Sequence, residues 1–215
     1  MEHTDAAQQL TDRLRADLTR GEYHPRERLV ESDLVERYGF PRGTVRTALV
    51  QLQAEGLIDR MPHKGAMVRS LSLAEAIELA EVRRELEVLC AREAARRGDS
   101  AEREQLAQML AALERLADAG DMHGYRQASL GFHEALMAMS RHTAAVHTLA
   151  TIRNFNLQQH FPTAFRAGSF AHSAEDHRRI GEAVLAGDAE LAEEAMRRHL
   201  DRVVLLLRDY ADVSQ

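Results

Sequence analysis

The chain contains 215 residues, of which 45% are hydrophobic and 29% are charged. This balance predicts a normal folded core and excludes an intrinsically disordered protein. The length fits two modest domains or one large one. The longest stretch without Asp, Glu, Lys or Arg runs from Asn154 to Phe165. It is too short and too polar to span a bilayer, so we expect no membrane partner.

Residue usage also indicates helices and a reducing compartment. Ala, Leu, Glu and Arg dominate, Trp is absent and aromatic residues make up only 5% of the chain, a composition that favours α-helix. The single cysteine, Cys90, allows no internal disulfide. Because no signal-peptide pattern opens the chain either, we expect a cytoplasmic protein.

Residues 1–70 have the pattern of a winged helix-turn-helix domain. Gly21 and Gly39-Phe40-Pro41 separate three helical segments, and a hairpin tip lies at His63-Lys64-Gly65. The expected elements are helices at 5–20, 31–38 and 42–55 and strands at 58–60 and 66–69. In such a domain the helix at 42–55 enters the major groove of DNA by its N-terminal end.

Residues 71–215 are expected to form a separate all-helical bundle. The boundary falls at about 69–72, because Ser72 and Glu75 have the spacing of a capping box that starts a helix. The expected helices are 73–97, 100–118, 121–139, 142–160, 170–186 and 188–211. The fold class is therefore mainly α, with a winged helix-turn-helix domain followed by a bundle of about six helices.

Positive charge is concentrated in the first domain, although the whole chain carries a net charge of −6. Residues 1–70 hold 11 basic and 11 acidic side chains, whereas residues 71–215 hold 17 and 23. Within 37–69 the basic residues outnumber the acidic ones, and Lys64, the only lysine of the chain, lies at the expected wing tip. Because phosphate binding depends on local charge, a net acidic chain does not exclude DNA as a partner.

Four ionisable side chains fall on the apolar faces of four different expected helices: Arg83, His133, His177 and His199. A buried charge or imidazole without a partner is costly, so these groups should share one site. Three imidazoles from different helices are suitable ligands for a divalent transition metal such as Zn²⁺, Ni²⁺ or Mn²⁺. A metal-free site of hydrogen-bonded histidines is the alternative.

Residues 18–68 resemble the DNA-binding domain of the GntR family of bacterial transcription regulators. The matching residues are Gly21, Pro25, Arg28-Leu29, Glu31, Leu34, Tyr38-Gly39, Arg42, Thr44-Val45-Arg46, Ala48-Leu49, Leu52, Glu55-Gly56-Leu57 and Lys64-Gly65-Ala66. The helical half resembles the FCD-type ligand-binding domain of the FadR subfamily. Its matching residues are Arg83, Leu86-Glu87, Phe132-His133, His177, Ile180, Gly187-Asp188, Met196 and His199-Leu200. Together the two resemblances cover most of the chain, in the family's order.

The resemblance implies that two segments contact DNA. The residues are Arg42, Gly43, Thr44 and Arg46 of the second motif helix and His63, Lys64 and Gly65 of the wing. The chemistry agrees, because arginine can pair bidentately with guanine or with phosphate. Arg42 and Arg46 are four residues apart and so share one helix face. Pro41 stands where the family usually has serine, so we expect the helix to begin without a capping hydroxyl.

The resemblance also bears on the histidines. Many members of the subfamily bind metal through three histidines and one acidic or amide residue, which here would be Ser129, one turn before Phe132-His133. Serine is a poor metal ligand, so either water and an effector complete the shell of His133, His177 and His199, or the site is metal-free. The subfamily's effectors are often organic acids. Arg83 could clamp such a carboxylate beside the three histidines.

These features predict a ligand-responsive transcription regulator, a repressor that a small organic acid or related metabolite releases from operator DNA. A homodimer would place two recognition helices in successive major grooves of a pseudo-palindromic double-stranded operator. Three other functions use the same residues: a metal-sensing regulator, a metal-dependent hydrolase, and a regulator with a long-chain acyl ligand in a metal-free pocket. The hydrolase lacks a well-placed general base and leaves the winged helix unexplained, so we expect no enzyme.

Overall fold

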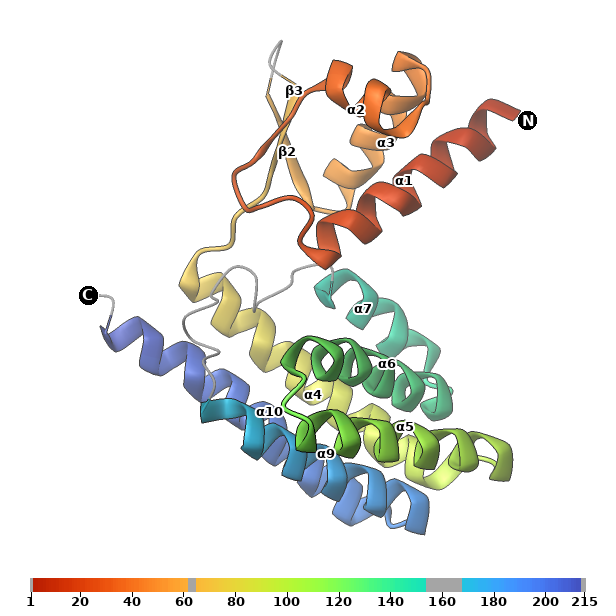
Figure 1. The fold of residues 1–215 in the computed structure, drawn as a ribbon, viewed down its shortest axis with the longest axis vertical. Helices are drawn as coiled ribbons and strands as arrows, with labels where there is room; N and C mark the ends of the chain where they lie inside the picture. The colour runs from red at the N-terminus through yellow and green to blue at the C-terminus, as the bar shows by residue number, and fades with distance from the viewer. Residues whose placement is uncertain (1, 62–64, 154–167, 214–215) are drawn as a thin grey trace. The chain divides into compact units, whose positions relative to one another are not determined.

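The computed structural model describes the backbone of residues 2–61, 65–153 and 168–213, and the side chains of 5–61, 65–152 and 172–210. The described elements form two compact units, the first holding the elements up to Ser72 and the second those from Leu73 onward (Figure 1). The predicted fold class is confirmed, because a small helical unit with one sheet is followed by a unit built from helices.

The first unit contains three helices and a three-stranded antiparallel sheet of order β1-β3-β2. Its elements are α1 (Glu2–Arg20), β1 (Arg28–Leu29), α2 (Glu31–Tyr38), α3 (Arg42–Ala54), β2 (Ile58–Met61) and β3 (Gly65–Val68). The sequence did not predict β1, which is only two residues long and pairs Leu29 with Ala66 of β3. Through this pairing, the segment before α2 joins the hairpin of β2 and β3, which is the wing.

The core of the first unit explains why these segments are helices. In α3, Val45, Ala48, Leu49 and Leu52 recur at helical spacing and are buried. They pack with leucines of α1 and with residues of the sheet in one apolar cluster. At the end of α2, Gly39 adopts φ 75° and donates its N–H to the Val35 carbonyl at 2.9 Å. The left-handed conformation at Gly39 stops α2 and sets the turn before α3.

The second unit is an array of helices with no strand among its described residues. Its elements are α4 (Leu73–Arg97), α5 (Ser100–Asp118), α6 (Met122–Ser140), α7 (Thr143–Arg153), α9 (Gly168–Ala186) and α10 (Ala189–Val213). These bounds agree with the predicted helices to within two residues, except that residues 154–160 of the expected fourth helix lie outside the described part. No helix in the described ranges has both the length and the apolar character needed to cross a membrane.

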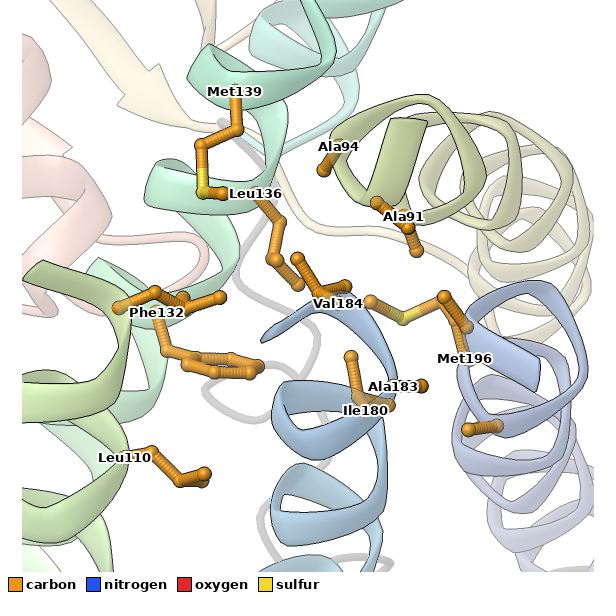
Figure 2. Close-up of a cluster of buried hydrophobic side chains, with 14 of the residues drawn as sticks. Ala91, Ala94, Leu110, Phe132, Leu136, Met139, Ile180, Ala183, Val184 and Met196 are labelled. Carbon is orange, nitrogen blue, oxygen red and sulfur yellow. The ribbon is translucent and has the colours of Figure 1, made fainter. Parts of the chain in front are cut away.

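Small and large apolar residues alternate across the core of this unit (Figure 2). The cluster draws on α4, α5, α6, α9 and α10, with Ala91 and Ala94 facing larger side chains such as Leu136 and Met196. At Gly181 of α9, an added Cβ would lie 2.8 Å from Leu110 of α5. Glycine thus lets these two helices approach closely, and a larger residue there would have to displace the flexible end of the Leu110 side chain.

Arg103 of α5 joins the C-terminal ends of two other helices. Its guanidinium donates to the Ala95 carbonyl at 2.7 Å and to the Gly98 carbonyl at 3.1 Å, both at the end of α4. It also donates to the Val184 and Leu185 carbonyls at the end of α9. The last carbonyls of a helix have no partner within the helix, so one cation satisfies two helix termini at once.

Cys90 lies in a second, smaller apolar cluster of the same unit. It is 1% exposed and packs with Met137 of α6 and with Ala145 and Leu149 of α7. Burial raises the pKa of the Cys90 thiol, against the opposing effect of a hydrogen bond with Ser140. This thiol is a structural, apolar group and not a reactive one.

Candidate DNA-reading face and buried histidine centre

The exposed face of α3 carries two arginines. The side chains of Arg42 and Arg46 are 63% and 60% exposed, and Gly43 and Thr47 are exposed beside them. An added Cβ at Gly43 would meet no atom within 4 Å. The opposite face of α3 is buried in the core, so the packing of the helix alone presents this polar row to solvent.

The other residues predicted to contact DNA have different surroundings. Thr44 is only 6% exposed, so its side chain belongs to the core side of α3. Gly65 has φ 82°, and a Cβ there would lie 2.7 Å from the Leu29 carbonyl oxygen of β1. The backbone conformation at position 65 and the close approach of β1 therefore favour glycine there, whether or not the residue contacts DNA. His63 and Lys64 lie outside the described residues.

Pro41 acts as expected at the start of α3. It has the extended ψ of 149° that precedes a helix, and no side chain caps the helix. Its carbonyl accepts the first helical hydrogen bond, from the Val45 N–H at 3.1 Å. The helix begins at Arg42 without a capping hydroxyl, which leaves the N-terminal N–H groups open.

Glu31, which sequence reasoning did not assign to the site, lies between the two arginines. Arg46 Nε donates to both carboxylate oxygens of Glu31, at 2.9 and 3.1 Å. Arg42 Nε lies 4.0 Å from the same carboxylate. These side chains line an open cleft of about 700 Å³, whose lining residues are Arg28, Val30, Glu31, Ser32, Arg42, Arg46, Arg60, Met61 and Gly65.

In the second unit, the three predicted histidines meet. His133 of α6, His177 of α9 and His199 of α10 are all buried, and one ring nitrogen from each lies within 4.8 Å of the others. The Nε2 atoms of His133 and His177 are 3.0 Å apart. The ring centroids of His177 and His199 are 4.7 Å apart. Three different helices, of which only α9 and α10 are consecutive in the chain, therefore direct imidazoles at one point.

Hydroxyl groups surround His177. Tyr125 OH lies 2.7 Å and Ser173 Oγ 3.4 Å from its Nδ1, while Ser129 Oγ lies 3.1 Å from its Nε2. Burial, together with the charges of His199 and His133, holds the pKa of His177 well below its usual value. The ring is therefore neutral near pH 7 and keeps a lone pair for a ligand. Burial also raises the pKa of Tyr125 to about 12.

His133 is backed by a buried ion pair on α4. Its Nδ1 lies 2.7 Å from Glu87 Oε2, and the other oxygen of Glu87 accepts a hydrogen bond from Arg83 Nε at 2.6 Å. Burial would raise the pKa of Glu87, but the charges of Arg83 and His133 lower it well below its usual range. Burial lowers the pKa of His133, although Glu87 opposes this. A carboxylate at Nδ1 leaves Nε2 of His133 for the centre.

His199 has a comparable acidic neighbour. Its Nδ1 lies 3.6 Å from Asp176 Oδ2, and Asp176 is 1% exposed. Arg198 and Arg202 contact the same carboxylate at 3.2 and 3.3 Å. Burial opposes ionisation of Asp176, but the nearby His199 and the two arginines lower its pKa. Two of the three histidines thus each have a carboxylate near Nδ1.

The donor set fits a divalent transition metal. Two nitrogens bound to one tetrahedral ion at about 2.1 Å lie about 3.4 Å apart, and the Nε2 atoms of His133 and His177, at 3.0 Å, are close to this separation. Two like nitrogens at this distance in a buried site need either a shared proton or a cation between them. Carboxylates behind metal-binding histidines are also the usual outer contacts of such sites. Ser129 adds a hydroxyl to this set and no charge.

The structure therefore brings together His133, His177, His199 and Ser129, and places Arg83 one step away, through Glu87. The sequence analysis gave no site role to four residues of this centre: Tyr125, Ser173, Asp176 and Glu87. The available signal was spacing, since Glu87 is four residues after Arg83 and Ser173 is four before His177. Asp176 directly precedes His177 and offered no such periodic signal.

A winged helix-turn-helix with an exposed arginine face, followed by a helical unit with a buried polar centre, defines a ligand-responsive DNA-binding regulator. Comparison with known families agrees. The family model described as bacterial regulatory proteins, gntR family, matches residues 6–68, and the FCD domain model matches residues 78–202. The chain belongs to the GntR family of bacterial regulatory proteins and carries an FCD domain. It is accordingly a transcription regulator and not an enzyme.

Individual relatives that are named as transcription regulators are similar to this chain over most of their length. The chain is 32% identical over 200 residues to the HTH-type transcriptional repressor GlaR of Escherichia coli (strain K12), covering 87% of this chain and 89% of GlaR. It is 27% identical to the HTH-type transcriptional regulator LutR of Bacillus subtilis (strain 168), covering 88% and 95%. The solved structure of E. coli McbR/YncC matches with a TM-score of 0.83 at 19% identity, over 96% of this chain and 98% of that one. This last likeness shows a shared fold.

Proposed function

We propose that this regulator is a cytoplasmic repressor, active as a homodimer, that a small carboxylate releases from operator DNA. Residues 1–70 read DNA, and residues 71–215 bind the effector and form the dimer. The observation that carries the proposal is the pairing of an exposed arginine face on α3 with a buried three-histidine centre in the same chain. The name of GlaR, a repressor, supports the direction of control.

The first part of the proposal is that α3 reads bases and phosphates through Arg42, Gly43 and Arg46. The wing residues His63, Lys64 and Gly65 add contacts to the backbone or minor groove. Because Thr44 is buried, Thr47 is the better candidate for a hydroxyl contact from this face. Arginine forks suit guanine and phosphate alike, so both affinity and specificity depend on this row.

The second part is that His133, His177 and His199 hold a divalent transition metal such as Zn²⁺, Ni²⁺ or Mn²⁺. When bound, the ion supplies positive charge and open coordination positions for a carboxylate. The chain's own residues orient the imidazoles: Glu87 faces His133 Nδ1, Asp176 faces His199 Nδ1, and Tyr125 faces His177 Nδ1. The hydroxyl of Ser129 lies beside His177 and leaves room for water or effector at the position where the family resemblance implies an acidic or amide ligand.

Arg83 keeps its expected role in this proposal, but Glu87 lies between it and the histidines. Its Nε is held by Glu87, and its side chain is 23% exposed. A guanidinium fixed through Nε still presents its two terminal nitrogens, which form the fork that carboxylates prefer. Arg83 therefore remains the proposed anion clamp, with Glu87 linking it to the histidines.

A single titration series tests the proposal. Calorimetry with Zn²⁺ should give saturable binding to the wild-type protein, strongly weakened binding to His177→Ala, and unchanged binding to His147→Ala, which removes an exposed imidazole outside the centre. The same proteins are then assayed on a duplex selected by the wild type from a random pool, with and without a panel of hydroxy- and dicarboxylates. Release by a carboxylate supports the proposal, whereas equal zinc binding by both variants contradicts the metal site.

The second candidate function is a metal sensor, and the shared three-histidine centre favours it. In that case Zn²⁺ alone would change the affinity for the selected duplex, and carboxylates would add nothing. The hydrolase is excluded by family, and three inward-facing imidazoles make an apolar cavity for a long acyl chain a poor alternative.

A further inference from the structure

Glu31 lies against the residues that contact DNA, although an acidic side chain repels phosphate. It is the first residue of α2, and its carboxylate is 20% exposed. Among the described residues that line the α3 cleft, it is the only acid beside four arginines: Arg28, Arg42, Arg46 and Arg60. A negative group in this position reduces affinity for any DNA backbone, so its presence needs a compensating benefit.

The way in which Glu31 contacts Arg46 points to that benefit. Both carboxylate oxygens accept from the single Nε of Arg46, at 2.9 and 3.1 Å. Among the described residues, the terminal Nη1 and Nη2 atoms of Arg46 donate to no protein group. Because these two atoms form the fork that pairs with guanine O6 and N7, the contact restrains the side chain and leaves its base-reading end open.

Arg42 stands in a different relation to the same carboxylate. Its Nε lies 4.0 Å from Glu31, beyond hydrogen-bond distance, and its side chain is 63% exposed. It feels the negative charge but is not held in one orientation. An arginine that is free to rotate suits phosphate, whose oxygens accept from many directions, better than a fixed base edge.

We propose that Glu31 is a specificity-determining residue: it orients Arg46 for base readout and lowers the affinity of the α3 cleft for DNA of unrelated sequence. This inference rests on the proposed DNA-reading role of α3. Specific binding then loses little from the extra negative charge, because the restrained fork loses less freedom on binding. Binding to unrelated DNA lacks that compensation, so only the repulsion remains.

The test compares two probes and three variants of the full chain. One probe is a duplex selected by the wild type from a random pool, and the other is a scrambled duplex of the same base composition. Glu31→Gln should tighten binding to the scrambled duplex, raise the salt dependence of that binding by about one unit of slope, and reduce the preference for the selected duplex about tenfold. Glu31→Asp keeps the charge but shortens the reach. It should leave scrambled binding near wild type and weaken selected binding.

Glu36→Gln is the matched control. It removes the same charge from an exposed position of α2, and it should leave the preference within about twofold of wild type. Equal effects of Glu31→Gln and Glu36→Gln would show that only net charge matters and would overturn the inference, while leaving DNA reading by α3 intact. If the wild type selects no sequence from the pool, that result contradicts both the proposed function and this inference. Thermal unfolding of each variant confirms that it is folded, and Glu31→Asp carries the test should Glu31→Gln unfold.

Discussion

Arg46 is exposed, and its proposed role is to read DNA rather than to stabilise the fold. Replacing it by alanine should lower affinity for a selected operator duplex by about 10- to 100-fold, since one bidentate base contact is worth about 1–3 kcal/mol. The melting temperature should stay close to that of the wild type, because an exposed ion pair contributes at most about 1 kcal/mol. Gel shift and thermal unfolding measure the two quantities. Arg20→Ala, on the exposed end of α1, is the control, and unchanged operator affinity in Arg46→Ala would refute the assignment.

Two glycines of the first unit should respond in opposite ways to alanine. Gly65 has φ 82° and a carbonyl oxygen 2.7 Å from the position of a Cβ, so Gly65→Ala should destabilise the unit by at least about 1–2 kcal/mol. Gly43 is helical and faces open space, so Gly43→Ala should stabilise the protein by up to about 1 kcal/mol. Denaturant unfolding measures both.

The same pair separates folding from recognition. If Gly43→Ala is stable but binds the selected duplex more weakly, the backbone at residue 43 approaches DNA closely. Destabilisation of equal size in both variants would contradict the conformational account of Gly65.

Some residues of the site could be identified from the sequence and others could not, for a physical reason. His133, His177 and His199 were recognisable because an imidazole on an apolar helix face is conspicuous. Glu87 was not, because α4 is rich in arginine and glutamate, and a buried glutamate has the same letter as exposed Glu85 two residues earlier. Only the packing of α4 against the other helices decides which of the two is enclosed.

At the scale of helices and strands, the helical segments followed from apolar spacing, whereas β1 was too short to carry any pattern. Helix ends were harder, because they depend on partners that are distant in sequence. Asp99 caps α5 in a reciprocal capping box with Glu102, and the three-residue spacing of these two side chains is a local signal in the sequence. The capping of α4 and α9 by Arg103 has no local signal at all.

That capping makes Arg103 the strongest stability prediction in the second unit. Arg103→Ala removes a donor from partly buried carbonyls at the ends of α4 and α9, of which Val184 keeps the Gly187 N–H, and should cost about 2–4 kcal/mol. Arg178→Ala is the matched control, since Arg178 makes half-exposed ion pairs within α9, and it should change stability by less than about 1 kcal/mol. Denaturant unfolding followed by circular dichroism measures the free energy of unfolding of each variant. An equal decrease in both would mean that the helix-end contacts of Arg103 contribute no more than the ion pairs of Arg178.

At the scale of the whole protein, the proposed repressor couples two sites on one chain. If a carboxylate weakens binding of the selected duplex by some factor, that duplex must weaken carboxylate binding by the same factor, because the coupling free energy is reciprocal. Calorimetric titration of the carboxylate into free protein and into the protein–DNA complex measures the second factor. Unequal factors would show that the carboxylate acts on DNA binding by a route other than linkage.

The proposed homodimer makes a geometric prediction for the operator. Two chains should bind each duplex, with half-sites centred about 10 base pairs, or a multiple of one helical turn, apart. Analytical ultracentrifugation of the complex and footprinting of the selected duplex measure the stoichiometry and the spacing. One chain per duplex would remove the dimer from the proposal.

Because Cys90 is enclosed, its thiol can report local opening of the helical unit. As the single thiol of the chain, shielded by α6 and α7, it can react with an aromatic disulfide reagent only when that layer opens. The rate at which the chromophore of the reagent is released therefore measures how often the helical unit opens locally, without any label or substitution. A metal or carboxylate that binds only the closed form should lower the rate of this thiol reaction in proportion to the fraction of protein that is bound. A crude library of metabolites can then be screened on the native chain before a single operator is known.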